Sequence, residues 1–175
     1  MLKRFALSLI FATGLAFAGT AGEAGRYVEA DDYLHSVFEA EVPAAQTLWV
    51  AGDLRENVER ILGHRFSGLR VRYWANEATS AWILDEIGKE LPITIGVAVA
   101  NGAIADVEVL EFRESRGWEV RYPFFTDQFA DARLDHDQSL DRRIDGITGA
   151  TMSVDAVTRV ARIALLLHEH VATTD

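Results

Sequence analysis

The chain has 175 residues, a formal net charge of −10 and 49% hydrophobic residues, which suits one folded domain and excludes a disordered chain. The acidic balance argues against nucleic acids and anionic membranes as partners, because both are bound by clustered Lys and Arg. The sequence contains no cysteine. Disulfides, thiolate metal sites, iron–sulfur clusters and c-type haem are therefore excluded, and any redox chemistry needs another bound group.

The first residues have the three-part pattern of a secretory signal peptide. A short basic start precedes the mostly apolar run Phe5–Ala18, and small residues offer cleavage sites near Ala18 or Ala21. The run is short for a membrane span, and an uncleaved anchor is the alternative. We expect a signal peptide over residues 1–21 and a periplasmic or otherwise exported mature protein.

Two helices are predicted before the pattern changes. Residues 22–44 are interpreted as a Gly- and acid-rich leader followed by a helix, because "YLHSVFEA" carries apolar residues at helical spacing and Pro43 ends it. A clearer helix follows in "DLRENVERILGH", where Asp53 can cap the start and Gly63 closes the end.

Four strands are predicted next, from apolar residues that recur at every second position. They span residues 69–74, 80–87, 92–100 and 104–112. Asn101-Gly102 is a hairpin signal between the last two. Short connections between consecutive strands imply an antiparallel sheet.

A loop-rich segment, Arg113–Arg143, leads to a last helix. A loop of that length in a compact domain is usually functional. From Val154 onward an apolar stripe recurs at helical spacing, formed by Val157, Val160, Ala161, Ala164, Leu165 and His168. The predicted fold class is therefore α+β, an antiparallel sheet with helices packed over one of its faces.

The stretch "DGITGAT", residues 145–151, stands just before this helix. One interpretation is a capped helix start, since Thr148, Thr151 and Ser153 can each act as N-cap. Gly149 and Ala150 also leave the backbone bare beside a hydroxyl, which suits the close approach of a large group. A helix N-terminus further offers free N–H groups to a phosphate.

This stretch resembles the flavinylation motif of FMN-binding domains, Asp-x-x-(Ser/Thr)-(Gly/Ser)-Ala-Thr. Such domains occur in the C subunit of the sodium-pumping NADH:quinone reductase and the G subunit of the Rnf complex. The fixed positions are met by Asp145, Thr148, Gly149, Ala150 and Thr151. The resemblance implies that Thr151 carries FMN as a phosphoester, attached by an FAD:protein FMN transferase with Mg²⁺. Asp145, with Gly146 after it, would either fix the turn or be recognised by the transferase.

The resemblance extends upstream and covers roughly residues 90–170. The hairpin around Asn101-Gly102 is followed by Glu114 and Gly117, which fall at the family's Glu-x-x-Gly, while Ser115-Arg116 replaces the more usual Thr-Pro. "FFTDQF" resembles the family's aromatic-Gln patch. The nearest aromatic side chains for the flavin ring are Trp118, Tyr122, Phe124 and Phe125.

Other chemistry is not favoured. The acidic run "DHDQS" lacks the Gly and Glu that a calcium loop needs, and His168 and His170 are badly spaced for one helix face, so no metal site is expected. Nucleotide fingerprints are also missing, which argues against direct NADH binding.

The sequence therefore predicts an exported electron-transfer flavoprotein with an FMN-binding domain over residues 45–175. Its expected partners are the transferase and a redox donor and acceptor, such as a membrane reductase or a cytochrome. A carrier is favoured over an enzyme because no substrate pocket is indicated. The alternatives are a small flavin-dependent reductase that acts directly on a substrate and a non-redox ligand-binding module of the same fold.

Overall fold

A computed structural model describes residues 25–39 and 41–174 of the chain. The predicted signal peptide, with its cleavage positions near Ala18 and Ala21, lies outside the described residues. Among the helices that are described, none combines the length and the apolar composition needed to cross a membrane.

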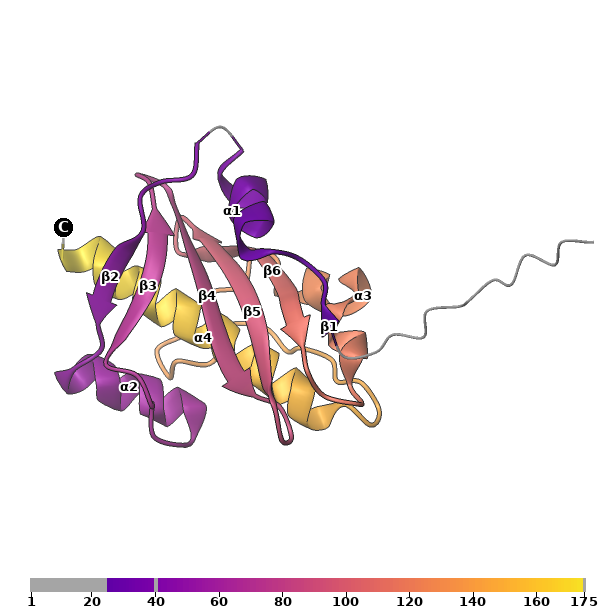
Figure 1. The fold of residues 1–175 in the computed structure, drawn as a ribbon. Coiled ribbons are helices and arrows are strands. Elements are labelled where there is room, and N and C mark those ends of the chain that lie inside the picture. The colour runs from indigo at the N-terminus through magenta and orange to yellow at the C-terminus, as the bar shows by residue number, and fades with distance from the viewer. Residues whose placement is uncertain (1–24, 40, 175) are drawn as a thin grey trace, which may run out of the picture.

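The structure has one antiparallel sheet of six strands in the order β1-β6-β5-β4-β3-β2 (Figure 1). The strands are β1 Gly25–Arg26, β2 Gln46–Trp49, β3 Arg70–Ala75, β4 Thr79–Ile87, β5 Pro92–Ala100 and β6 Ala103–Phe112. The helices are α1 Ala30–Phe38, α2 Gly52–Leu62, α3 Pro123–Thr126 and α4 Thr151–Thr174. The predicted α+β class and the antiparallel sheet are confirmed.

The predicted hairpin between β5 and β6 is also confirmed. Asn101 and Gly102 have φ values of 53° and 71°. Two consecutive positive φ angles define the type I′ turn that joins antiparallel strands with little distortion. Asn and Gly tolerate this backbone best, which is why the pair is a reliable signal.

Strands β1 and β2 were not predicted. They form the two edges of the sheet, and most of their residues are exposed. An exposed edge strand needs no alternation of apolar and polar residues, so its sequence carries little signal. Backbone pairing with β6 and β3 holds them in place.

The core lies between the sheet and α4. The predicted α4 stripe from Val157 to Leu165 is buried, as are the alternating residues Ile93, Ile95 and Val97 of β5. Tyr73 and Trp82 stack within it, with ring centroids 4.8 Å apart. The helix begins at Thr151, one turn before the apolar stripe predicted it.

The prediction that all helices cover one face of the sheet is wrong. Helices α2 and α4 cover one face, whereas α1 lies across the other (Figure 1). Tyr33 of α1 packs directly on Gly96, where a Cβ atom would lie 2.5 Å from the tyrosine ring. Gly96 faces away from α4 because it alternates with Ile95 and Val97. Local spacing predicts that a helix has a buried side but does not say which sheet face it covers.

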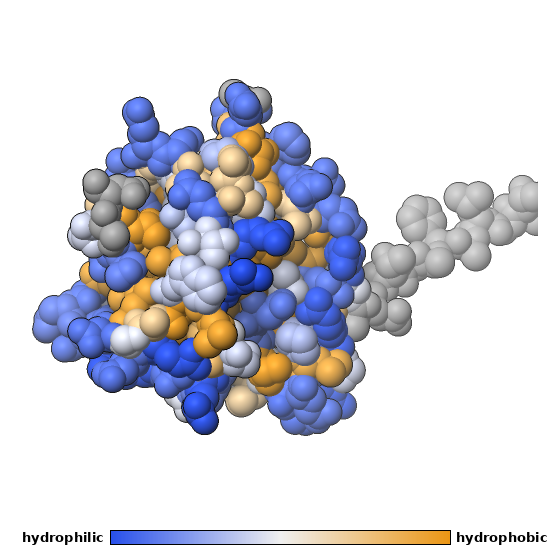
Figure 2. Space-filling view, turned by 60° about the vertical axis from the view of Figure 1, so that its left-hand side comes forward, coloured by the Kyte–Doolittle hydropathy of each residue, from blue (hydrophilic) through white to orange (hydrophobic). Residues whose placement is uncertain are grey.

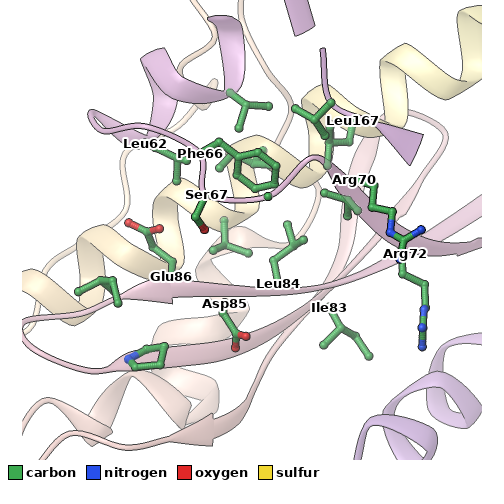
Figure 3. Close-up of a pocket in the computed structure, with 18 of the residues that line it drawn as sticks. Leu62, Phe66, Ser67, Arg70, Arg72, Ile83, Leu84, Asp85, Glu86 and Leu167 are labelled. Atoms are coloured by element: carbon green, nitrogen blue, oxygen red, sulfur yellow. The ribbon is translucent and has the colours of Figure 1, made fainter. Parts of the chain in front are cut away.

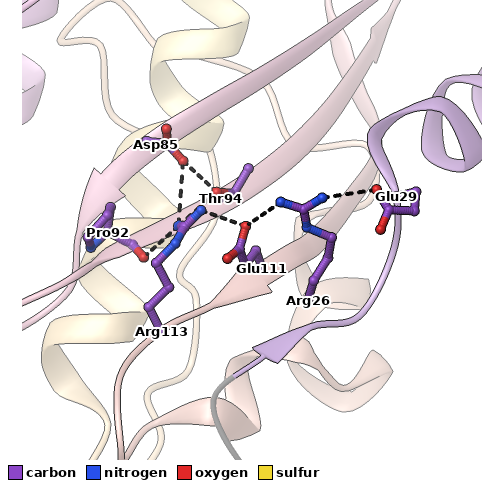
Figure 4. A network of polar contacts seen from close by, with 7 residues as sticks. All are labelled: Arg26, Glu29, Asp85, Pro92, Thr94, Glu111 and Arg113. Atoms are coloured by element: carbon purple, nitrogen blue, oxygen red, sulfur yellow. Dashed lines mark hydrogen bonds and ion pairs between the residues drawn. The ribbon is translucent and has the colours of Figure 1, made fainter.

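Charged side chains line the α1 face at the opposite edge from β2 (Figure 4). Arg26 lies 3.1 Å from Glu29 and 3.3 Å from Glu111, whose carboxylate also lies 2.6 Å from Arg113. Arg113 in turn reaches Asp85 at 3.9 Å. This chain of pairs connects the short strand β1 to β4 and β6 and places two arginines among three of the acidic groups of this face.

A second charge cluster fixes the end of β4 to α4. The Glu86 carboxylate is only 4% exposed and accepts from Arg159 Nε at 2.9 Å and from His64 Nε2 at 3.1 Å. The other ring nitrogen of His64 lies 3.0 Å from the Arg65 carbonyl oxygen. Because that carbonyl and the Glu86 carboxylate both favour the protonated ring, the pKa of His64 is raised.

This cluster predicts a stability change near neutral pH. A folded-state pKa above the unfolded value of about 6.5 stabilises the protein at low pH, and that contribution is lost as pH rises through the folded pKa. His64 is about half exposed, so we expect less than about 1 kcal/mol. Urea denaturation at about pH 6 and pH 8 should show that His64→Gln loses less stability on this rise than the unsubstituted chain. Equal losses in both proteins would contradict the role given to His64.

Candidate functional site

The motif forms a tight turn followed by the start of α4. The Ala150 N–H donates to the Ile147 carbonyl at 3.0 Å, and Gly149 has a φ of 84°. A positive φ at the third position alone is typical of a type II turn, which favours glycine there. Thr148 is thus a turn residue, and it is exposed.

The first helical hydrogen bond runs from the Val154 N–H to the Ala150 carbonyl at 3.0 Å. Ala150 therefore holds the N-cap position, and none of the three hydroxyl residues proposed as caps holds it. Its methyl group is buried, whereas a Cβ on Gly149 would meet open space. Only Gly149 keeps the surface bare, and the small size of Ala150 serves packing.

Thr151 is the first residue of α4, and its side chain is exposed. The N–H groups of residues 151–153 precede the first intrahelical donor and carry the positive end of the helix dipole. The first turn contains no acidic residue that would occupy them. The position is therefore suited to a phosphate attached to the Thr151 hydroxyl.

A cavity of about 590 Å³ lies beside Thr151. Three segments form its walls: the β4–β5 turn, the loop after β6, and the first turn of α4 with the residues before it. The lining residues are Lys89, Glu90, Glu114, Ser115, Arg116, Gly149, Ala150, Thr151, Met152 and Ser153. Its volume is within the range of small-molecule and cofactor sites, roughly 300–1,000 Å³.

The buried carboxylate of Glu114 holds one wall of this cavity in place. The carboxylate oxygen Oε1 accepts the backbone N–H groups of Lys89, Glu90 and Leu91 at 2.6, 2.6 and 2.9 Å. Burial by itself would raise the pKa of Glu114, but the three N–H donors outweigh it and the pKa lies below its ordinary value. Glu114 therefore holds the β4–β5 turn against the loop after β6.

Removing this carboxylate should loosen that wall. Glu114→Ala leaves three N–H groups without their acceptor, and water can replace only part of the interaction, so we expect a loss of about 2 kcal/mol in the free energy of unfolding. Glu90→Ala, at an exposed position of the same turn, serves as the control and should change little.

The effect of Glu114 also depends on pH. A depressed pKa stabilises the fold above the unfolded value of about 4.3, and that stability is lost as pH falls through the folded pKa. Denaturation at about pH 7 and pH 4 should therefore show a smaller pH effect in Glu114→Ala. A variant with the same pH dependence as the unsubstituted chain would exclude this role.

Gly117 brings the loop after β6 against the start of α4. It has a φ of 88°, and a Cβ atom there would lie 2.4 Å from Ser153 Oγ and 3.5 Å from the Ala150 methyl group. Both the backbone angle and the space require glycine. The predicted Glu-x-x-Gly thus acts through two separate contacts, one at each side of the cavity.

Two cationic side chains, Arg116 and Lys89, line the cavity, and the sequence patterns did not predict either of them as a site residue. Arg116 makes no hydrogen bond or ion pair with any residue that the structure describes, and Lys89 Nζ lies 3.6 Å from Glu90 Oε1. Both line the same cavity as Thr151. In the sequence Arg116 is only a departure from the usual motif, and Lys89 stands in the β4–β5 turn, far from Thr151 along the chain.

Trp118 does not line this cavity and belongs to a neighbouring aromatic surface. Its ring meets Tyr122 edge to face at 5.7 Å, and Tyr122 lies 6.3 Å from Phe124, which is 61% exposed. Arg121 lies over the Trp118 and Tyr122 rings. Phe125 is fully buried and is a core residue. Tyr122 and Phe124 are exposed and Trp118 is partly buried, so these three rings form the accessible aromatic surface of this region.

Gln128 connects the aromatic surface to the motif. Its Oε1 accepts the Asp145 N–H at 2.7 Å, and its Nε2 donates to the Phe124 carbonyl at 3.3 Å. The Asp145 carboxylate is exposed and lies 3.8 Å from Arg143. Gly146 is exposed, with open space where a Cβ would stand. The turn is thus held by the Asp145 backbone, which leaves its carboxylate accessible.

Comparison with known protein families identifies the domain that contains this site. Residues 88–166 match the model of the family described as the FMN-binding domain. This part of the chain belongs to the FMN-binding domain family. Among curated proteins no match to the chain is found. The matched region runs from the β4–β5 turn through β5, β6 and the cavity into α4, so it includes every residue predicted for the site. The match supports a flavin-binding module over residues 88–166, with FMN as its cofactor.

Proposed function

We propose that the protein is an exported electron carrier that holds FMN as a phosphoester on Thr151. One observation carries the proposal: an exposed threonine begins α4 beside a cavity of about 590 Å³ inside an FMN-binding domain. The free N–H groups of the helix start and the side chains of Arg116 and Lys89 would hold the phosphate. These residues fit the cofactor, because an anion there meets cations and no competing acid in the first turn.

Attachment requires a partner enzyme, because a threonine hydroxyl is a weak nucleophile without an activating base. In an FAD:protein FMN transferase reaction with Mg²⁺, Thr151 Oγ1 would attack the FMN phosphorus of FAD, its proton would pass to the transferase, and AMP would leave. The open space at Gly149 and the exposed Asp145 carboxylate support close approach of such an enzyme. We assign Asp145 to recognition by the transferase.

The flavin ring would pack on exposed apolar groups near the phosphate. Met152 is 47% exposed, lines the cavity and directly follows Thr151, and Trp118 follows Gly117, which packs on Ser153 in the first turn of α4. Bound FMN supplies reversible electron transfer, and the protein supplies position and local polarity. A flavin on so open a site would be reachable by a redox protein, which favours a carrier over an enzyme with an enclosed substrate pocket.

Export accords with the covalent link. The N-terminal pattern predicts a signal peptide, and an ester bond would prevent the loss of a soluble cofactor outside the cytoplasm. The donor and acceptor would be redox proteins such as a membrane reductase or a cytochrome.

The proposal is tested by producing the chain with and without an FAD:protein FMN transferase. We expect flavin fluorescence that stays with the denatured protein band only when the transferase is present. A band without flavin under both conditions would refute the covalent link. Steady-state reduction of a small acceptor by the purified flavoprotein, without redox partners, would replace the carrier with a reductase.

A further inference from the structure

Strands β3 and β4 separate part-way along their length. Their pairing ends at Tyr73 opposite Trp82, although β4 continues to Ile87 and pairs with β5 throughout. The Gly88 N–H donates to the Leu91 carbonyl. Because backbone groups in an antiparallel pair point alternately to the two neighbouring strands, Glu86 and Leu84 also turn their N–H and C=O groups toward β5. The intervening residues Ile83 and Asp85 turn theirs toward the gap, where no described strand pairs with them.

The gap is held open by contacts between α2 and the loop before β3. Arg55 donates to the carbonyl oxygens of Phe66 and Gly68, the latter at 3.0 Å. Glu59 Oε1 accepts the Phe66 N–H at 3.1 Å. The start of β3 is therefore held next to α2 and β2, and it lies apart from β4.

A cavity of about 380 Å³ lies in this gap between β3 and β4 (Figure 3). Its deep wall is aliphatic and comes from α2, α4, β3 and the connection before α2, with the buried residues Val50, Val58, Leu62, Val71, Val160, Ile163 and Leu167. Protein cores are packed with few voids of this size, so an apolar opening here is unusual. Figure 2 looks onto this side of the molecule and shows hydrophobic side chains reaching the surface among hydrophilic ones.

The mouth of the cavity on the α1 face carries a net positive charge. Arg70 and Arg72 line one side, opposite Ile83 and Asp85 (Figure 3). Neither arginine has a hydrogen bond or ion pair within the described part of the chain. Asp85, by contrast, accepts from Thr94 and lies 3.9 Å from Arg113.

The acid at the inner side of the cavity is also compensated, since Glu86 is paired with Arg159 and His64. In a protein with a net charge of −10, two unpaired guanidinium groups above an aliphatic cavity form a local site for an anion. The backbone N–H and C=O groups of Ile83 and Asp85, which face the gap, add fixed hydrogen-bonding positions.

We propose that this cavity binds a small amphipathic carboxylate, with its apolar body between β3 and β4 and its carboxylate on Arg70 and Arg72. One water molecule occupies ~30 Å³ of liquid, so a cavity of about 380 Å³ has room for a ligand of on the order of a dozen non-hydrogen atoms. This site is separate from the flavin site, because the two cavities share no lining residue. Val160 also lies nine residues after Thr151, about 13 Å along the axis of α4.

The test uses 4-phenylbutyrate as the probe and its neutral amide as the control ligand. Calorimetric titration of the purified protein should show saturable binding of the carboxylate, and NMR should place the perturbed amides around residues 83–87 and the start of β3. Arg70→Gln/Arg72→Gln should weaken binding by about 10-fold or more, because the carboxylate loses its charge-assisted hydrogen bonds to the two guanidinium groups. Arg65→Gln, an exposed arginine outside the cavity, is the matched control and should bind normally.

Two further variants keep the outcome decisive. Ser67→Trp, at an exposed position on the rim, should fill the opening and remove binding in a folded protein. Thr151→Ala should bind the probe unchanged, so a failure of covalent flavin attachment would not affect the result. The proposal is overturned if no saturable binding occurs, if the amide binds equally well, or if Arg70→Gln/Arg72→Gln binds the carboxylate as tightly as the unsubstituted chain.

Discussion

Replacing Thr151 with alanine is expected to remove all flavin that survives denaturation of the protein. The ester needs the Thr151 hydroxyl, and no neighbouring hydroxyl occupies the same position. Thr148 lies on the preceding turn, and Ser153 is 4% exposed against Gly117. Flavin fluorescence of denatured bands, after production with the transferase, measures the effect directly.

The controls separate chemistry from folding. Thr148→Ala, at an exposed position of the same motif, should keep a covalently bound flavin, although its yield can fall if the transferase contacts it. The free energy of unfolding of Thr151→Ala should stay within about 0.5 kcal/mol, because Thr151 is exposed. A Thr151→Ala band that keeps its flavin would disprove the assignment.

Gly117→Ala is expected to destabilise the fold by about 3 kcal/mol. A left-handed backbone costs a non-glycine residue roughly 1–2 kcal/mol, and forcing a methyl group into packed space costs roughly 1–3 kcal/mol more. Here φ is 88° and Ser153 Oγ would lie 2.4 Å from the new methyl group. Because Ser153 lies in the first turn of α4, we also expect less covalent flavin per protein at equal transferase levels.

Gly63→Ala is the matched control. Gly63 has a φ of 75°, but a Cβ there would meet nothing within 4 Å, so only the backbone cost of about 1 kcal/mol remains. Adding Ser153→Ala to Gly117→Ala removes the closest clash and should restore part of the stability. Equal losses for Gly117→Ala and Gly63→Ala would show that the close contact with α4 is unimportant.

The central sheet and α4 were predictable because their residues alternate or recur with one clear period. The hairpin at Asn101-Gly102 was predictable for a different reason, since its backbone angles favour those two residue types. Edge strand β2 carries no such pattern, and the face chosen by α1 depends on small residues such as Gly96 in a distant strand. These features are set by tertiary contacts, which a local pattern does not encode.

In the candidate site, too, the sequence predicts some features, whereas others depend on tertiary contacts. Thr151 and its turn follow from the motif, and Glu114 and Gly117 follow from the resemblance upstream. Their physical roles do not, because Glu114 binds backbone N–H groups of the β4–β5 turn, and Gly117 packs on Ser153. Arg116 and Lys89 come together only when the fold brings three separate segments around one cavity.

Peptide mapping of the protein from its native host tests the central claim most directly. Cleavage after Arg143 and Arg159 releases one peptide that contains Thr148, Thr151, Ser153 and Thr158. Fragmentation mass spectrometry should find the mass of FMN less one water on this peptide, placed at Thr151. An unmodified peptide, or the same mass placed at another residue, would contradict the account.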